Sequence, residues 1–218
     1  MKKKRERVVL PEGTQVPDHI AIIPDGNRRW ARARGLSSIE GHKRGAEALA
    51  KVLEASRDLN IHTVTFWGLS TENWREREAE ERKFLIRTIS AGLDRHLEDA
   101  KEKGVRVIHL GHKDRLPKWL IKKIERIEKE TLQNTEHVFN IALDYGGRDE
   151  IVGAVQKIVR SGVRADQIDA KFIDGFMDTA DQPYPYPDLI IRTSGEQRTS
   201  GLLLWQSNYA ETYWELDH

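Results

Sequence analysis

"HIAIIPDGNRRWARARG", residues 19–35, shows the pattern that decides the fold prediction. Its first five residues form a short apolar run rich in β-branched side chains, which predicts a buried strand. Pro24 ends the run, and an acid, a glycine, an amide and two arginines follow directly. The stretch therefore predicts a strand that leads through a polar turn toward a helix, with one carboxylate, Asp25, beside a concentration of positive charge.

The same alternation of short apolar runs and helical periodicity continues along the chain. Further buried strands are expected at 62–69, 105–110, 138–143, 188–192 and 202–205. Helices are expected at 45–59, 77–103 and 117–132, each with one apolar face, and near Arg148 and Gln167. Segment 180–188, "ADQPYPYPD", cannot continue a helix and predicts an exposed connection into the next strand.

This order of elements predicts an α/β fold. We expect a single domain at 19–218, with a mainly parallel central sheet of about six strands and helices on both faces. A basic tail, residues 1–18, precedes it. With 218 residues and 38% hydrophobic content, the chain supports one substantial core, and no repeat or linker divides it.

Composition excludes several classes of site. The chain has no cysteine, so disulfides, thiolate metal sites and cysteine nucleophiles are excluded. The 36 basic residues nearly balance the 35 acidic ones, so no global field attracts nucleic acid, and a nucleic-acid-binding role for the arginines of 28–34 is disfavoured. Any anion site must come from a local arrangement of side chains.

The N-terminal sequence "MKKKRERVVL" bears on the location of the protein. It is basic but lacks the apolar centre of a signal peptide, and no stretch reaches the roughly 20 apolar residues that span a bilayer. We expect a cytoplasmic protein. For residues 2–5, a solvated tail and peripheral contact with an anionic membrane are the two alternatives.

Polar clusters follow three of the expected strands, where open parallel sheets bind their ligands. The first is "PDGNRRW", 24–30, in which Gly26 permits close backbone approach, the arginines offer donors to a phosphate, and Asp25 could hold Mg²⁺. An ordinary Asp–Gly turn with a salt-bridged surface is the alternative. The second, "GLSTENW", 68–74, packs Ser70, Thr71, Glu72 and Asn73 together, which also suits a helix N-terminus.

The third cluster is "RTSGEQRTSG", 192–201, in which Arg192, Arg198 and Ser200 surround a glycine and favour a diphosphate or carboxylate pocket. Glu211, expected beyond the last strand, adds a second carboxylate. Three groups of hydrogen-bond donors that suit an anion, together with two acidic residues, indicate an Mg²⁺-assisted transferase that acts on diphosphates. The glycine-rich motifs of nucleotide-binding proteins and the H-E-x-x-H motif of metalloproteases are missing from the sequence.

Five ordered blocks resemble those of the cis-prenyltransferases, the undecaprenyl and dehydrodolichyl diphosphate synthases. They are "HIAIIPDGNRRWA", "GHKRGAE", "FWGLSTENW", "NIALDYGGRDEI" and "LIIRTSGEQRTSGLLLWQSNYAE", and they run from about 19 to 215. "IIPDGNRRW" with "RTSGE" looks closer to the archaeal and eukaryotic forms. The resemblance implies a homodimeric enzyme that uses Mg²⁺ to extend an allylic diphosphate, farnesyl or geranylgeranyl, with isopentenyl diphosphate. The product would be a long polyprenyl diphosphate for a glycosyl-carrier lipid, released with peripheral membrane contact.

The resemblance also implies roles for individual residues. Asp25 would position Mg²⁺ and help to ionise the allylic diphosphate, Asn73 would remove the proton from the condensing unit, and Glu211 would be the second metal ligand. The residues that would hold the allylic diphosphate are Gly26, Asn27, Arg28, Arg29, Trp30 and His42. Those that match the second block are Ser70, Thr71, Glu72 and Trp74, and those that match the isopentenyl diphosphate site are Arg192, Arg198, Thr199 and Ser200.

The expected helix at 77–103 would wall a hydrophobic tunnel for the growing chain. Its apolar stripe, Ile86, Ile89, Leu93 and Leu97, fits an ordinary core equally well, and both can hold at once.

Several positions depart from the family pattern, among them Pro24, which replaces the Met of most bacterial members. Ser38 and Glu76 stand where arginines are usual, and Gln197 replaces a common histidine. Arg75 or Arg77 is expected to supply the charge missing at Glu76. A non-catalytic partner subunit is the alternative function, and the presence of Asp25, Arg198 and Ser200 argues against it.

Overall fold

A computed structural model describes residues 10–217, and they form one six-stranded sheet in which every paired strand runs parallel. The strand order is β3-β4-β2-β1-β5-β6. The strands are β1 (His19–Ile23), β2 (Thr63–Ser70), β3 (Val105–Leu110), β4 (His137–Tyr145), β5 (Leu189–Arg192) and β6 (Glu211–Trp214). The single α/β domain and the first five strands are confirmed.

The helices follow the predicted order. They are α1 (Asn27–Arg32), α2 (Ser38–Asp58), α3 (Thr71–Glu76), α4 (Ala79–Glu102), α5 (Lys118–Glu130), α6 (Gly147–Ser161), the 3₁₀ turn η1 (Ala165–Gln167) and α7 (Ala170–Asp174). Helix α2 begins seven residues earlier than its apolar periodicity predicts, because Ser37 and Glu40 form a capping box there. Most residues of this added part are polar, so it has no apolar periodicity that would predict a helix.

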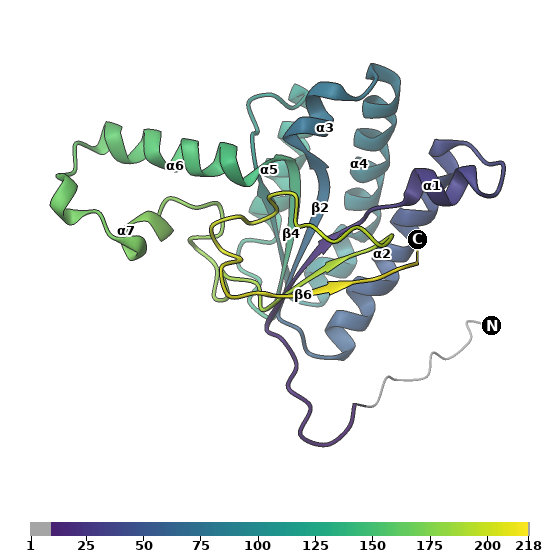
Figure 1. Ribbon diagram of the computed structural model, residues 1–218, viewed down its shortest axis with the longest axis horizontal. Helices are drawn as coiled ribbons and strands as arrows, with labels where there is room; N and C mark the ends of the chain where they lie inside the picture. The colour runs from purple at the N-terminus through teal and green to yellow at the C-terminus, as the bar shows by residue number, and fades with distance from the viewer. Residues whose placement is uncertain (1–9, 218) are drawn as a thin grey trace.

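Three long helices cover one face of the sheet. Helices α2, α4 and α5 pack there on the apolar side chains of β1 to β4. The inner residues predicted for α5 are all buried: Leu120, Ile124, Ile127 and Thr131. Helices α6 and α7 project to one side instead (Figure 1).

The opposite face of the sheet departs from the prediction. Helices were expected on both faces, but the buried side chains of this face pack against Leu202 and Leu203 of an irregular segment. The predicted strand at 202–205 is therefore wrong: these residues form turns, and Leu203 has a left-handed backbone with φ 47°. An apolar run can fill a core without joining a sheet, and this one lies on the sheet rather than in it.

The sixth strand lies further along the chain, and this changes the position of Glu211. Glu211 is the first residue of β6, not a residue beyond the last strand. It pairs with Leu189 at the start of β5, whereas Arg192 at the end of β5 pairs with Trp214. Glu211 thus lies at the amino end of the sheet, about 10 Å along the strand from the end at which Arg192 lies.

A buried chain of polar side chains ties the proline-rich segment to the sheet. His19 Nε2 and Asn140 Nδ2 both contact Thr65 Oγ1, at 2.8 and 2.9 Å, and Asn140 also donates to Gln182 Oε1. The carbonyl of Tyr184 lies 2.9 Å from His19 Nδ1. The segment at 180–188 is mostly exposed as predicted, yet this network holds it in place.

Two expectations concern contact with a membrane. The basic residues 2–5, with their possible membrane contact, lie outside the described residues. Within residues 10–217, no helix combines the length and the apolar character needed to cross a membrane.

Candidate active site

Asp25 lies just beyond the end of β1, where the neighbouring strand β5 delivers Arg192. Arg192 Nη2 donates to Asp25 Oδ2 at 2.8 Å, and the amide of Gly26 donates to Asp25 Oδ1 at 2.6 Å. Arg29 Nη2 lies 3.2 Å from the same Oδ1. The carboxylate and the arginines predicted from separate blocks therefore meet at one point.

The position of Asp25 is fixed through its backbone. Thr193 Oγ1 donates to the Asp25 carbonyl at 2.6 Å, and Ser194 Oγ donates to the same oxygen at 3.0 Å. Burial opposes ionisation of the Asp25 carboxyl, but the hydrogen bonds from Arg192 and from Gly26 outweigh it, so its pKa lies below the ordinary value. Asp25 is an anion at neutral pH.

Helix α1 approaches α2 very closely, and two glycines make this possible. A Cβ at Gly41 would lie 2.1 Å from the backbone oxygen of Asn27, and one at Gly45 would lie 2.6 Å from the Asn27 side-chain amide. The turn before α1 also depends on glycine, because Gly26 has φ 94°. The "GHKRGAE" block therefore positions the polar turn after β1.

The second polar cluster is both a helix start and part of the site. Ser70 is the N-cap of α3, and its Oγ accepts from the Asn73 amide at 3.1 Å. Ser70, Glu72 and Asn73 nevertheless line the same cavity as Asp25. The capping alternative and the functional one are therefore compatible.

Arg77, rather than Arg75, faces the cavity. Its Nη1 donates to Glu81 Oε1 at 2.7 Å, its side chain is only 17% exposed, and its Nε is buried without a hydrogen-bond partner. Arg75 is 64% exposed, and its nearest acid, Asp149, is 3.8 Å away. Of the two arginines expected to supply the charge missing at Glu76, Arg77 is the one that lines the cavity.

Glu81 joins three elements around this pocket. Besides Arg77, it contacts His42 Nε2 of α2 at 3.2 Å and Arg28 Nη1 of α1 at 3.8 Å. Burial lowers the pKa of His42 against the opposing hydrogen bond from Glu81. Sequence reasoning missed Glu81, although its spacing of four residues after Arg77 is a signal for an ion pair on a helix.

The third cluster surrounds Arg192, which is 6% exposed. Its Nη1 donates to Ser200 Oγ at 2.8 Å and to the Arg198 carbonyl at 2.5 Å, while its Nε is buried without a partner. Arg198 is largely exposed and pairs with Glu196, whose carboxylate also lies 3.3 Å from Arg29. Glu196 was not among the predicted residues.

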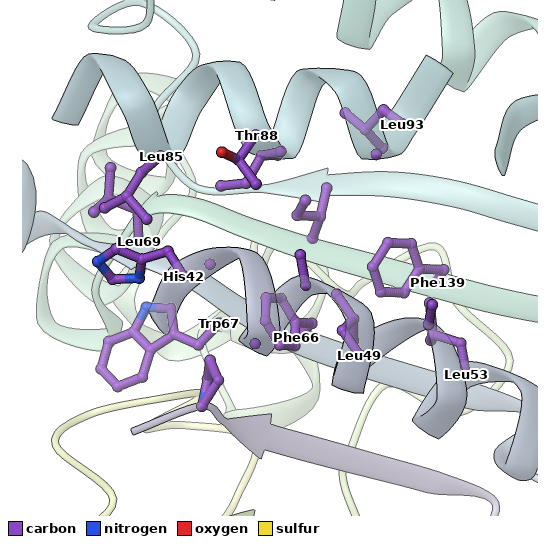
Figure 2. Close-up of a pocket in the computed structure, with 18 of the residues that line it drawn as sticks. His42, Leu49, Leu53, Phe66, Trp67, Leu69, Leu85, Thr88, Leu93 and Phe139 are labelled. Atoms are coloured by element: carbon purple, nitrogen blue, oxygen red, sulfur yellow. The ribbon is translucent and has the colours of Figure 1, made fainter. Parts of the chain in front are cut away.

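These groups open into a cavity of about 1340 Å³. Its polar end includes Asp25, Asn27, Arg28, His42, Ser70, Glu72, Asn73, Arg77, Arg192, Arg198 and Ser200. The rest is mainly apolar, with Leu49 and Leu53 of α2 facing Leu85 and Leu93 of α4 (Figure 2). In the predicted stripe of α4, Ile86 belongs to the core alone, whereas Ile89, Leu93 and Leu97 both pack against the core and line the cavity.

Some predicted residues do not line the cavity. Trp74 packs into the core beside Leu69, and Trp30 lies under the guanidinium of Arg34, 4.4 Å from its ring centre. The others outside the lining are Gly26, Arg29, Thr71, Thr199 and Glu211. Because Glu211 lies at the opposite end of the sheet, it does not join Asp25 within the chain.

The donor set near Asp25 decides what metal would fit. Within residues 10–217, no three His, Asp or Glu side chains converge on a metal-sized site. Mg²⁺ is commonly held by one or two carboxylates, with phosphate and water oxygens completing its shell. Near Asp25, a single anionic carboxylate stands beside hydrogen-bond donors that suit a phosphate. This arrangement fits Mg²⁺ that arrives bound to a diphosphate, and it does not fit a metal held by protein ligands alone.

Comparisons with known proteins agree with this geometry. Residues 23–217 match the family described as "Putative undecaprenyl diphosphate synthase". An isoprenyl transferase of Heliobacterium mobile is 45% identical over 203 residues, which cover 91% of this chain and 77% of the relative. A tritrans,polycis-undecaprenyl-diphosphate synthase (geranylgeranyl-diphosphate specific) of Picrophilus torridus is 42% identical, covering 91% of this chain and 79% of the relative.

Solved structures show the same fold. Lavandulyl diphosphate synthase from Lavandula x intermedia, in complex with dimethylallyl diphosphate, superposes with a TM-score of 0.87 at 35% identity, over 92% of this chain and 87% of that one. A probable undecaprenyl diphosphate synthase from Campylobacter jejuni gives a TM-score of 0.75 at 28% identity, over 93% and 87% of the two chains.

Proposed function

The chain belongs to the cis-prenyltransferase family of undecaprenyl diphosphate synthases and is a prenyl-chain-elongating enzyme, and from this premise we propose how its residues divide the reaction. The observation that carries the proposal is the meeting of Asp25 with cationic side chains at the mouth of a long apolar cavity. A prenyl diphosphate needs cationic side chains for its diphosphate and, directly beside them, an apolar space for its hydrocarbon chain.

The allylic diphosphate is assigned to the pocket between α1, α2 and the start of α4. Arg28, His42 and Arg77 converge there on Glu81, and Asn27 and Asp25 complete the lining. When the allylic C–O bond breaks, its electron pair leaves with the diphosphate, and fixed cations stabilise the charge that develops. Mg²⁺ held by Asp25 would supply further neutralisation of that leaving group.

Isopentenyl diphosphate is assigned to the loop after β5. Arg192 and Ser200 are already hydrogen-bonded to each other there, and Arg198 adds an exposed guanidinium next to them. Arginine forks suit diphosphate oxygens because they donate two parallel hydrogen bonds. The loop lies beside Asp25 through the Arg192 contact, so the two substrates can share one reaction centre.

The double bond of isopentenyl diphosphate then attacks the allylic carbon, and one proton must leave to form the new cis double bond. Asn73 lines this part of the cavity, but an amide is a poor base in water. We assign Asn73 the positioning of the reacting carbon and assign proton acceptance to a diphosphate oxygen. The chain then moves along the apolar cavity for the next addition.

The finer properties implied by the family resemblance belong to this proposal. The primer is farnesyl or geranylgeranyl diphosphate, and the product is a long polyprenyl diphosphate that leaves through peripheral membrane contact of a cytoplasmic enzyme. A homodimer is supported by α6, which projects from the body (Figure 1). Val152, Val155 and Val159 are exposed on this helix. Light scattering of the purified protein measures the oligomeric state.

One assay tests the reaction. Purified protein, Mg²⁺, labelled isopentenyl diphosphate and either primer should give polyprenyl product that extracts into butanol. Asp25→Ala should lose turnover while keeping the fold by circular dichroism, and Asp25→Glu should keep part of the rate. Absence of product with both primers would refute the proposed substrates, and a fully active Asp25→Ala would refute the role of the carboxylate.

A further inference from the structure

The cavity runs along two helices, away from the diphosphate pocket. Both α2 and α4 begin at this pocket, where His42 and Glu81 meet. Arg57 lies fifteen residues after His42 on α2, and Asp99 lies eighteen residues after Glu81 on α4. At 1.5 Å per residue, these positions are about 22 and 27 Å from the pocket. Both residues still line the cavity, so it extends to the far ends of the two helices.

An ion pair joins the two helices at this far end. Arg57 Nη2 lies 3.6 Å from Asp99 Oδ2. The neighbouring lining residues Ala100 and Val105 are buried and apolar, while Glu54, Arg95 and His96 of the same two helices also line this end of the cavity, so its apolar lining gives way to charged side chains around the pair. The side chain of Arg57 is only 21% exposed, and that of Asp99 is 40% exposed. The guanidinium is therefore the more buried member of the pair.

A second, small cavity lies next to the same arginine. It measures about 20 Å³ and is lined by Arg57 together with Ile61, His62, His137 and Val138. Leu53, Arg57 and Val105 line both cavities. Arg57 is the charged side chain among these three shared residues, so it lies at the boundary between the two spaces.

We propose that Arg57, held by Asp99, is the end stop that limits product length. This inference rests on the proposed elongation of a chain within the cavity. Each addition pushes the apolar end of the product further from the pocket, and burial of its carbons favours this movement. At Arg57 the next unit would have to press hydrocarbon against a guanidinium and separate it from its carboxylate. Such contact removes solvation from a charge without compensation, so elongation stops there.

Product-length analysis of four variants tests the proposal. Arg57→Ala removes the stop and should shift the distribution by one or more isoprene units toward longer chains. Asp99→Asn keeps the arginine but frees it, and should lengthen and broaden the distribution. The double exchange Arg57→Asp with Asp99→Arg restores the pair and should return the distribution toward that of the wild type. Reverse-phase chromatography of the dephosphorylated products gives the readout.

Lys103→Met is the matched control. Lys103 Nζ pairs with the other oxygen of Asp99 at 2.6 Å, but Lys103 does not line the cavity. Its loss should leave product length unchanged. Unchanged lengths in both Arg57→Ala and Asp99→Asn would overturn the proposal, as would a shift in Lys103→Met as large as that in Asp99→Asn. Failure of the wild type to make any product would instead refute the proposed function, so the two failures are distinguishable.

Discussion

Gly41→Ala tests whether the close contact of α1 with α2 positions the catalytic carboxylate. The new methyl carbon would lie 2.1 Å from the backbone oxygen of Asn27, whereas ordinary contact begins near 3.4 Å. A backbone oxygen cannot rotate away, so α1 must retreat by roughly 1 Å and carry the preceding turn with it. That turn contains Asp25.

The expected loss follows from this displacement. A misplacement of about 1 Å at a reacting group costs about 100-fold in rate, which corresponds to about 2.7 kcal/mol in the activation free energy. The free energy of unfolding should change less. Alanine gains about 1 kcal/mol over glycine in a helix, and overpacking costs about 1 to 3 kcal/mol. Gly41→Ala should therefore fold and yet lose most of its kcat/KM.

Two other glycines provide matched comparisons. A Cβ at Gly45 would meet only the side chain of Asn27, at 2.6 Å, and that side chain can rotate, so Gly45→Ala should lose less activity, about tenfold. A Cβ at Gly153 in α6 meets nothing within 4 Å, so Gly153→Ala should keep full activity and gain up to about 1 kcal/mol in stability. The assays are kcat/KM for the allylic primer and urea unfolding. A folded Gly41→Ala with wild-type kcat/KM would refute the reasoning.

Two further predictions concern charge. Arg77→Met should raise the KM for the allylic diphosphate about tenfold or more, because a hydrogen bond from a charged group contributes about 1.5 to 3 kcal/mol. The control Arg75→Met should change this KM less than twofold. Equal effects of the two substitutions in steady-state kinetics would contradict the assignment. Burial lowers the pKa of His19 and of His109 to about 4, so both are neutral in the fold and take up protons on unfolding below about pH 6.5. The free energy of unfolding should therefore fall between about pH 6.5 and pH 4, by up to about 3 kcal/mol for each histidine; urea titrations that give equal stability at pH 7 and pH 4.5 would contradict this.

Sequence patterns located the strands that are buried on both faces. The run at 19–23 matches β1 to the residue, because a central parallel strand needs a nearly unbroken apolar segment. The run at 105–110 also matches β3 to the residue, although β3 is an edge strand in which Arg106 and Ile108 are only partly buried. The same rule failed at 202–205, where the apolar run packs on the sheet from outside. It also failed at β6, an edge strand whose residues are mostly exposed and carry no apolar run.

The site was predictable as a set of residues but not as a set of contacts. Strand ends and the family blocks identified Asp25, Arg192 and Ser200, which the structure brings together. The choice between Arg75 and Arg77 depends on which of the two side chains points to the cavity at the end of the short helix α3. A helix of this length has too few residues for its periodicity to predict that direction. The pair of Arg57 and Asp99 arises from the packing of two helices, so it leaves no local signal.

The pairing of β1 with β5 has a consequence for the order of folding. Ile20 of β1 pairs with Leu189, so this contact closes a loop of nearly the whole domain, whereas β1 and β2 are separated only by the crossover that contains α1 and α2. Contacts of long sequence separation form late because their loop entropy must be overcome first. The apolar wall of α2 and α4 can assemble from the first half of the chain, but Arg192 reaches Asp25 only with β5. In refolding experiments, recovery of enzymatic activity should therefore lag behind recovery of helical circular dichroism.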